Sequence, residues 1–127
     1  MYKQLSSGIK ISITRSISFA FETYMAKIEW REDKYDLTDF VAHWQQYVLT
    51  NAAWYDKVPQ EMLSSVAFQE ELANKINEVI AKVLQQAPTD EQIKTIEQLE
   101  KATGKSMDYG CKAEATFVEN KLKALAN

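Results

Sequence analysis

The stretch GIKISITRSISFAF at residues 8–21 constrains the fold most, because it satisfies two incompatible periodicities. Its isoleucines and phenylalanines alternate with polar residues, as in a half-buried strand, and several of them also recur every four positions, as along a helix. Ile, Thr, Ser and Phe favour strands over helices. The four-residue repeat, however, continues through Phe21 to Met25, beyond the point where the alternation stops.

The absence of a second alternating segment in the sequence decides between these interpretations. A lone strand has no partner for its backbone N–H and C=O groups. We therefore predict a helix over residues 7–30, capped by Ser6 or Ser7. An α+β fold with an N-terminal strand at residues 8–21 is the alternative. In the helix, Ile11 and Phe19 lie off the main apolar face, which is a reason to expect self-association.

The middle of the chain carries two amphipathic segments. In DLTDFVAHWQQYVLT, residues 36–50, apolar residues recur at intervals of three and four, which predicts a helix with Asp36 as its N-cap. Beyond Pro59, residues 60–86 contain no breaker and predict one long helix. The short apolar seam of this helix, which indicates packing within a bundle, comprises Leu72, Ile76, Val79 and Val83.

The last third of the chain predicts a helical hairpin. Thr89 with Gln92 three residues later is typical of a capping box, and Gly104 lies where a helix commonly ends in a left-handed residue. The helical period resumes at Cys111. The chain contains only three Gly and two Pro, which also favours helices. We predict an all-α fold, with residues 1–127 forming a single helical domain, a bundle of four to five helices.

Charge and cysteine content narrow the function classes. The net charge of −3 is the sum of +3 over residues 1–28, −8 over residues 29–100 and +2 over residues 101–127. An acidic middle argues against a broad nucleic-acid surface. Cys111 is the single cysteine, which excludes an internal disulfide and is typical of a reducing compartment. Without an apolar run for a membrane span or a secretory signal, we predict a cytoplasmic protein with no membrane association.

No constellation of residues predicts catalysis. ATGKS at residues 102–106 is similar to the end of a phosphate-binding loop, but Leu99 stands where its first glycine should be. His43, the only histidine, follows Asp39 by four residues, a spacing typical of a surface pair on an amphipathic helix. Cys111 is expected to be a buried or inert thiol. We predict no enzyme, no catalytic residue, no cofactor and no metal site.

Aromatic residues crowd into residues 24–55. Some belong to core-facing stripes, but four lie at expected helix ends or in the junction NAAWYDKVP. Trp and Tyr are enriched among the anchors of protein interfaces. The predicted partner-binding residues are therefore Trp30, Tyr35, Trp54 and Tyr55. The alternative is that these rings cover the open ends of a small bundle.

These observations predict a small, non-catalytic protein that acts through protein–protein interaction, as a regulator or adaptor that binds a protein partner or self-associates. No motif identifies a family. The alternative is a nucleic-acid-binding regulator that uses the lysines of the C-terminal hairpin. Asp108 and Glu114 near the start of its second helix, and an eight-residue turn over residues 103–110, favour an ordinary hairpin instead. We therefore do not expect nucleic acid as a partner.

Overall fold

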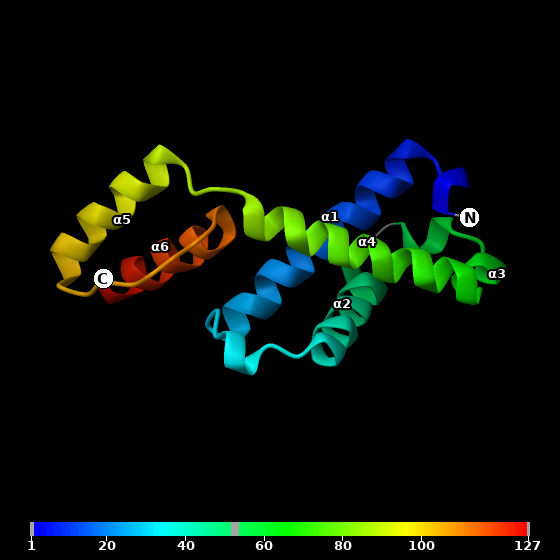
Figure 1. Cartoon of the computed structure of the whole chain (residues 1–127), viewed down its shortest axis with the longest axis horizontal. Coiled ribbons are helices and arrows are strands. Elements are labelled where there is room, and N and C mark those ends of the chain that lie inside the picture. The colour runs from blue at the N-terminus through cyan, green and yellow to red at the C-terminus, as the bar shows by residue number, and fades with distance from the viewer. Residues whose placement is uncertain (1, 52–53, 127) are drawn as a thin grey trace. The chain divides into compact units, whose positions relative to one another are not determined.

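Helices are the only regular secondary structure wherever the chain is described (Figure 1). The computed structural model describes residues 2–51 and 54–126, and within these ranges there is no strand. The fold class predicted from the sequence, all-α, is therefore confirmed. The chain divides into two compact units, Met1–Ile80 and Ala81–Asn127. The prediction that residues 1–127 form one domain stays a prediction.

Six α-helices and three short 3₁₀ helices make up the described chain. Helix α4 begins in the first unit and ends in the second. The α-helices are α1 (Ser7–Lys27), α2 (Leu37–Asn51), α3 (Gln60–Leu63), α4 (Val66–Gln85), α5 (Asp90–Thr103) and α6 (Lys112–Ala126). The 3₁₀ helices are η1 (Tyr2–Gln4), η2 (Glu32–Lys34) and η3 (Tyr55–Lys57).

The stretch with two periodicities is helix α1, so the alternative of a strand at residues 8–21 is wrong. The Ser6 hydroxyl accepts a hydrogen bond from the Ile9 N–H at 3.3 Å, as a helix cap does. Ile11 and Phe19 are each 51% exposed, as expected for residues off the apolar face. The buried face of α1 comprises Ile13, Ser16, Ile17, Ala20, Phe21, Tyr24 and Met25.

Helix α1 ends at Lys27, three residues earlier than predicted, because the chain reverses in a Schellman motif. The Glu29 N–H donates to the Ala26 carbonyl at 3.0 Å, and the Trp30 N–H donates to the Met25 carbonyl at 2.7 Å. Glu29 and Trp30 both adopt left-handed backbone conformations, with φ of 57° and 54°. Side chains are strained in this region, so the turn stores unfavourable backbone energy.

Helices α1 and α2 pack against each other through aromatic rings. The Phe40 ring meets the Phe21 ring edge to face at 5.7 Å and the Tyr24 ring at 5.8 Å. Asp36 caps α2 as predicted, because its carboxylate accepts the Asp39 N–H at 3.1 Å. The core of the first unit is therefore built mainly from large side chains.

The segment predicted as one helix over residues 60–86 is split, which raises the α-helix count to six among the described residues. Helix α3 ends at Leu63 and α4 begins at Val66. The Ser64 hydroxyl donates to the Gln60 carbonyl at 3.0 Å, and Ser65 Oγ accepts the Phe68 N–H at 3.5 Å. Serine hydroxyls compete with the backbone for hydrogen bonds, so adjacent serines can end one helix and start another.

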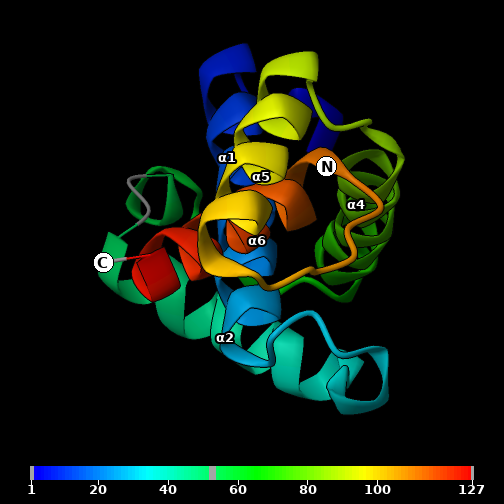
Figure 2. The ribbon, with the colours of Figure 1, turned by 90° about the vertical axis from the view of Figure 1, so that its left-hand side faces the viewer.

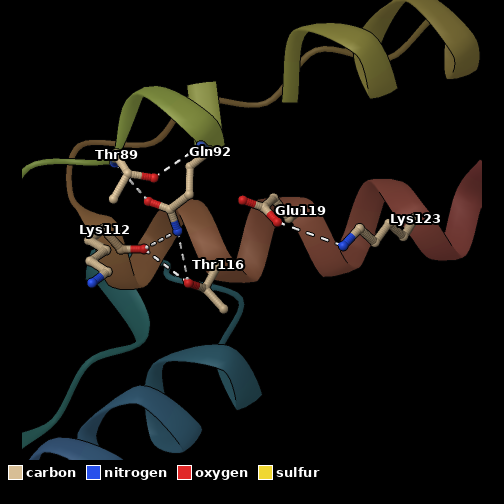
Figure 3. Close-up of polar contacts among 6 residues, drawn as sticks. All are labelled: Thr89, Gln92, Lys112, Thr116, Glu119 and Lys123. Atoms are coloured by element: carbon tan, nitrogen blue, oxygen red, sulfur yellow. Dashed lines mark hydrogen bonds and ion pairs between the residues drawn. The ribbon is translucent and has the colours of Figure 1, made fainter. Parts of the chain in front are cut away.

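In the second unit, α5 and α6 form the predicted hairpin; they lie next to each other in Figure 1, and α5 crosses in front of α6 in Figure 2. The predicted capping box is present: the Thr89 hydroxyl accepts the Gln92 N–H at 3.1 Å, and the Gln92 side chain accepts the Thr89 N–H at 3.0 Å. Figure 3 shows Gln92 Nε2 also donating to the Lys112 carbonyl and the Thr116 hydroxyl of α6. Gly104 ends α5 with φ of 71°, as predicted. The core residues are Ile96, Ala115, Val118 and Leu122.

Candidate partner-binding groove

An apolar groove of about 550 Å³ opens in the first unit between α2 and the segment from Trp54 to Asn77. We call it the α2–α4 groove. Its buried base includes Trp44, Val48, Trp54, Leu72 and Ile76. Its other lining residues are Leu37, Val41, Gln45, Leu49, Tyr55, Leu63, Gln69, Ala73 and Asn77. None of these described lining residues carries a charge, so the groove suits an apolar occupant.

Two leucines give the groove exposed apolar edges. Leu37 is 50% exposed and Leu49 is 62% exposed, and both lie on α2. Leu37 belongs to the stripe of apolar residues that recur at intervals of three and four in residues 36–50, whereas Leu49 lies outside this stripe. The position of Leu49 off that stripe is the same signal that marked Ile11 and Phe19 in α1, and it could have identified Leu49 as a surface residue.

A buried serine fixes the two tryptophans at the base of the groove. Trp44 Nε1 and Trp54 Nε1 each donate a hydrogen bond of 3.2 Å to the hydroxyl oxygen of Ser16. The Ser16 hydroxyl donates its own proton to the Ile13 carbonyl at 2.7 Å. The two indole rings stack with centroids 6.2 Å apart and planes 24° apart. One hydroxyl of α1 therefore holds both rings in place, which makes the groove base rigid.

The four predicted partner-binding residues fall into two pairs. Trp54 and Tyr55 line the α2–α4 groove and contact each other with ring centroids 5.9 Å apart. Trp30 and Tyr35 instead pack edge to face on Phe21, at 6.1 Å and 6.4 Å, near the turn that joins α1 to α2. The structure thus joins two of the four residues to the groove and places the other two on the α1–α2 core.

Burial separates these residues further. Trp54 is only 2% exposed. Its packing therefore resembles the alternative interpretation, in which the aromatic rings cover the open ends of the bundle. Trp30, Tyr35 and Tyr55 are half-buried. The partner-binding role of the four residues stays a prediction, because burial alone does not test binding.

His43 lies outside this groove, in a shallow polar depression lined also by Lys27, Asp39 and Gln46. Its Nε2 atom is 2.9 Å from the Thr23 hydroxyl oxygen, which makes Thr23 its hydrogen-bond partner. Burial, and to a smaller extent the charge of Lys27, lower the pKa of His43 from its usual 6.5. The imidazole is therefore held neutral near pH 7, beside a hydroxyl that also donates to the Ala20 carbonyl.

The remaining candidates for chemistry lie apart along the chain. Cys111 is buried in the second unit, as predicted for an inert thiol. Across residues 2–51 and 54–126, no group of three or more His, Cys, Asp or Glu side chains could hold a metal ion. Within the same ranges, no helix is both long enough and apolar enough to span a bilayer.

Comparison with known proteins adds no functional assignment. No family model, no curated protein and no solved structure matches this chain. The α2–α4 groove combines exposed apolar edges with a base held by buried hydrogen bonds.

Proposed function

We propose that this protein is a small, non-catalytic regulator or adaptor that binds an apolar segment of a partner protein in the α2–α4 groove. The observation that carries the proposal is the uncharged groove itself, with Leu37 and Leu49 exposed at its edges. Burying one Leu side chain in an interface stabilises a complex by roughly 1.5–3 kcal/mol. The proposal places the protein in the cytoplasm, on the basis of its single cysteine.

The rigid base of the groove supports this function. The Ser16 hydroxyl orders Trp44 and Trp54 through hydrogen bonds within the chain itself. A preformed pocket avoids the free energy of ordering its own side chains during binding, so more of the contact energy contributes to affinity. Trp and Tyr are enriched among the residues that contribute most to affinity near the centre of protein interfaces, where the surrounding contacts exclude water.

The nucleic-acid alternative lacks comparable support. The segment Ala81–Asn127 contains seven Lys and seven Asp or Glu residues, so its formal charge is zero. Affinity for nucleic acid comes chiefly from an excess of positive charge on one surface. We therefore keep the partner protein as the proposed ligand class.

Leu49 offers the sharpest test, because replacing the buried Trp54 would disturb the core as well as the groove. We expect Leu49→Asp to abolish capture of a partner from the source cells, because the change buries a carboxylate at the contact. Leu125→Asp is the matched control, since Leu125 is 56% exposed on α6 in the second unit. This control should retain the partner.

Two further measurements complete this test. Calorimetry with the purified partner should give at least a tenfold weaker affinity for Leu49→Asp, equivalent to about 1.4 kcal/mol. Circular dichroism should show that both variants remain folded. Equal partner affinity in Leu49→Asp, Leu125→Asp and the unsubstituted protein would rule out the α2–α4 groove as the binding surface.

A further inference from the structure

We infer that the occupant of the α2–α4 groove is an amphipathic α-helix of the partner that carries Lys or Arg beside its apolar face. This inference rests on the proposed function and names the chemistry of its partner. It follows from two properties of the groove, namely how few hydrogen-bonding groups line it and which charges stand next to it.

The lining of the groove favours a helix over an extended peptide. An extended segment must find partners for its backbone N–H and C=O groups, usually at a sheet edge. The described part of this chain has no strand, and the groove offers only the side-chain amides of Gln45, Gln69 and Asn77 and the phenol of Tyr55. A helix satisfies its own backbone and presents one apolar stripe, which is what an uncharged groove bordered by helices can bury.

The charges beside the groove are mainly negative. Asp36 precedes Leu37 in the chain, Asp56 follows Tyr55, and Glu70 follows Gln69. Glu61 lies in α3, two residues before Leu63. All four carboxylates belong to exposed residues. Because these exposed residues adjoin the groove lining in the chain, we expect a partner helix in the groove to meet acidic side chains around an uncharged centre.

Residues 36–80 contain only two lysines, Lys57 and Lys75, against seven Asp or Glu residues. Lys75 Nζ lies 3.3 Å from a Glu78 carboxylate oxygen and 5.5 Å from the centroid of the Tyr2 ring. Lys57 lines a different, smaller cavity together with Ser6 and Ser12. The exposed acidic residues next to the groove thus outweigh the positive charge nearby, and complementary charge on a partner would be basic.

Model peptides can test this inference separately from the proposed function. We would use three amphipathic helical peptides of about five turns, with the same Leu and Phe face and a polar face of Lys, Gln or Glu. The protein would carry Trp30→Phe, which leaves Trp44 and Trp54, both in the groove, as the only tryptophans. Tryptophan fluorescence then reports on occupancy of the groove.

The expected order of affinity at low salt is Lys, then Gln, then Glu. Exposed ion pairs contribute little each, so we expect the Lys peptide to bind about tenfold more tightly than the Gln peptide. This difference should shrink towards zero at about 1 M salt, because screening weakens exposed pairs. The double substitution Glu61→Gln with Glu70→Gln should lower the preference for Lys. The control Glu97→Gln in α5, whose residue is also exposed, should leave the preference unchanged.

Failure of the inference and failure of the proposed function give different results. If the Gln peptide binds as tightly as the Lys peptide at low salt, and Leu49→Asp weakens both, the basic-helix inference is wrong while the groove still binds apolar helices. If Leu49→Asp leaves the binding of every peptide unchanged, or no peptide alters the tryptophan fluorescence, the groove is not a helix-binding surface and both are wrong.

Discussion

The two units of this chain build their hydrophobic cores from different kinds of side chain. Unit one, Met1–Ile80, packs large aromatic rings around one buried hydroxyl, whereas unit two, Ala81–Asn127, packs Ile, Val, Leu and Ala between two helices. The α2–α4 groove lies beside the aromatic core, and one polar atom, Ser16 Oγ, orients two of the rings that line it.

The largest effect on stability is expected when the Ser16 hydroxyl is removed. Ser16→Ala should lower the free energy of unfolding by about 2–4 kcal/mol, because both indole N–H groups lose their buried acceptor. Urea unfolding followed by tryptophan fluorescence measures the change, since all three tryptophans lie within residues 1–80. Ser18→Ala, a half-buried serine on the same helix, should change this energy by no more than about 0.5 kcal/mol. Equal effects of the two substitutions would show that Ser16 does not organise the core.

The ends of helices α1 and α5 can also be compared, because the chain leaves each helix through a residue in the left-handed backbone conformation. This residue is Gly104 at the end of α5 but Glu29 at the end of α1. Glu29→Gly should raise the free energy of unfolding by about 1 kcal/mol, since glycine adopts φ of 57° without strain. Urea midpoints at constant slope measure this gain.

Gly104→Ala should instead lower the free energy of unfolding, by about 1 kcal/mol, because alanine is strained at the left-handed conformation of this position. A Cβ at position 104 meets no other atom within 4 Å, so its effect reports on the backbone alone. For both Glu29→Gly and Gly104→Ala, far-ultraviolet circular dichroism follows the unfolding of the helices in urea. A destabilising Glu29→Gly would mean that the Glu29 side chain contributes more than its backbone strain removes.

The smallest expected effect is the pH dependence associated with His43. Its pKa is lower in the folded protein than the usual 6.5, so the unfolded chain binds more protons between those two values. The His43 contribution to stability is therefore fully present above pH 6.5 and declines as the pH falls through the folded-state pKa. His43→Gln should reduce the difference in urea midpoint between about pH 7 and pH 5. An unchanged difference would assign this pH dependence to other groups.

Local signals in the sequence predicted most of the fold. The caps at Ser6, Asp36 and Thr89 and the left-handed Gly104 depend on residues within four positions, so their patterns are readable without tertiary information. The helix over the opening stretch was predicted because its four-residue repeat extends to Met25. The break at Ser64 and Ser65 was missed, because serine is tolerated inside helices and ends them only when its hydroxyl engages the backbone.

The groove could be predicted only in part. Trp54 and Tyr55 were selected from aromatic clustering, and both line the groove. The sequence pattern did not reveal that Trp54 would be buried, because its indole N–H reaches Ser16, 38 positions away along the chain. The position of Leu49 off the apolar stripe marks it as a surface residue, but its place at the groove edge depends on lining residues outside its own helix and was not readable from the sequence.

The most direct measurement follows the three indole N–H signals by NMR while the partner recovered by affinity capture is added to saturation. Trp44 and Trp54 line the α2–α4 groove, whereas Trp30 packs on Phe21. We predict that the signals of Trp44 and Trp54 shift on binding and that the signal of Trp30 stays in place. A shift of the Trp30 signal alone, or no shift of any indole signal in the bound protein, would contradict it.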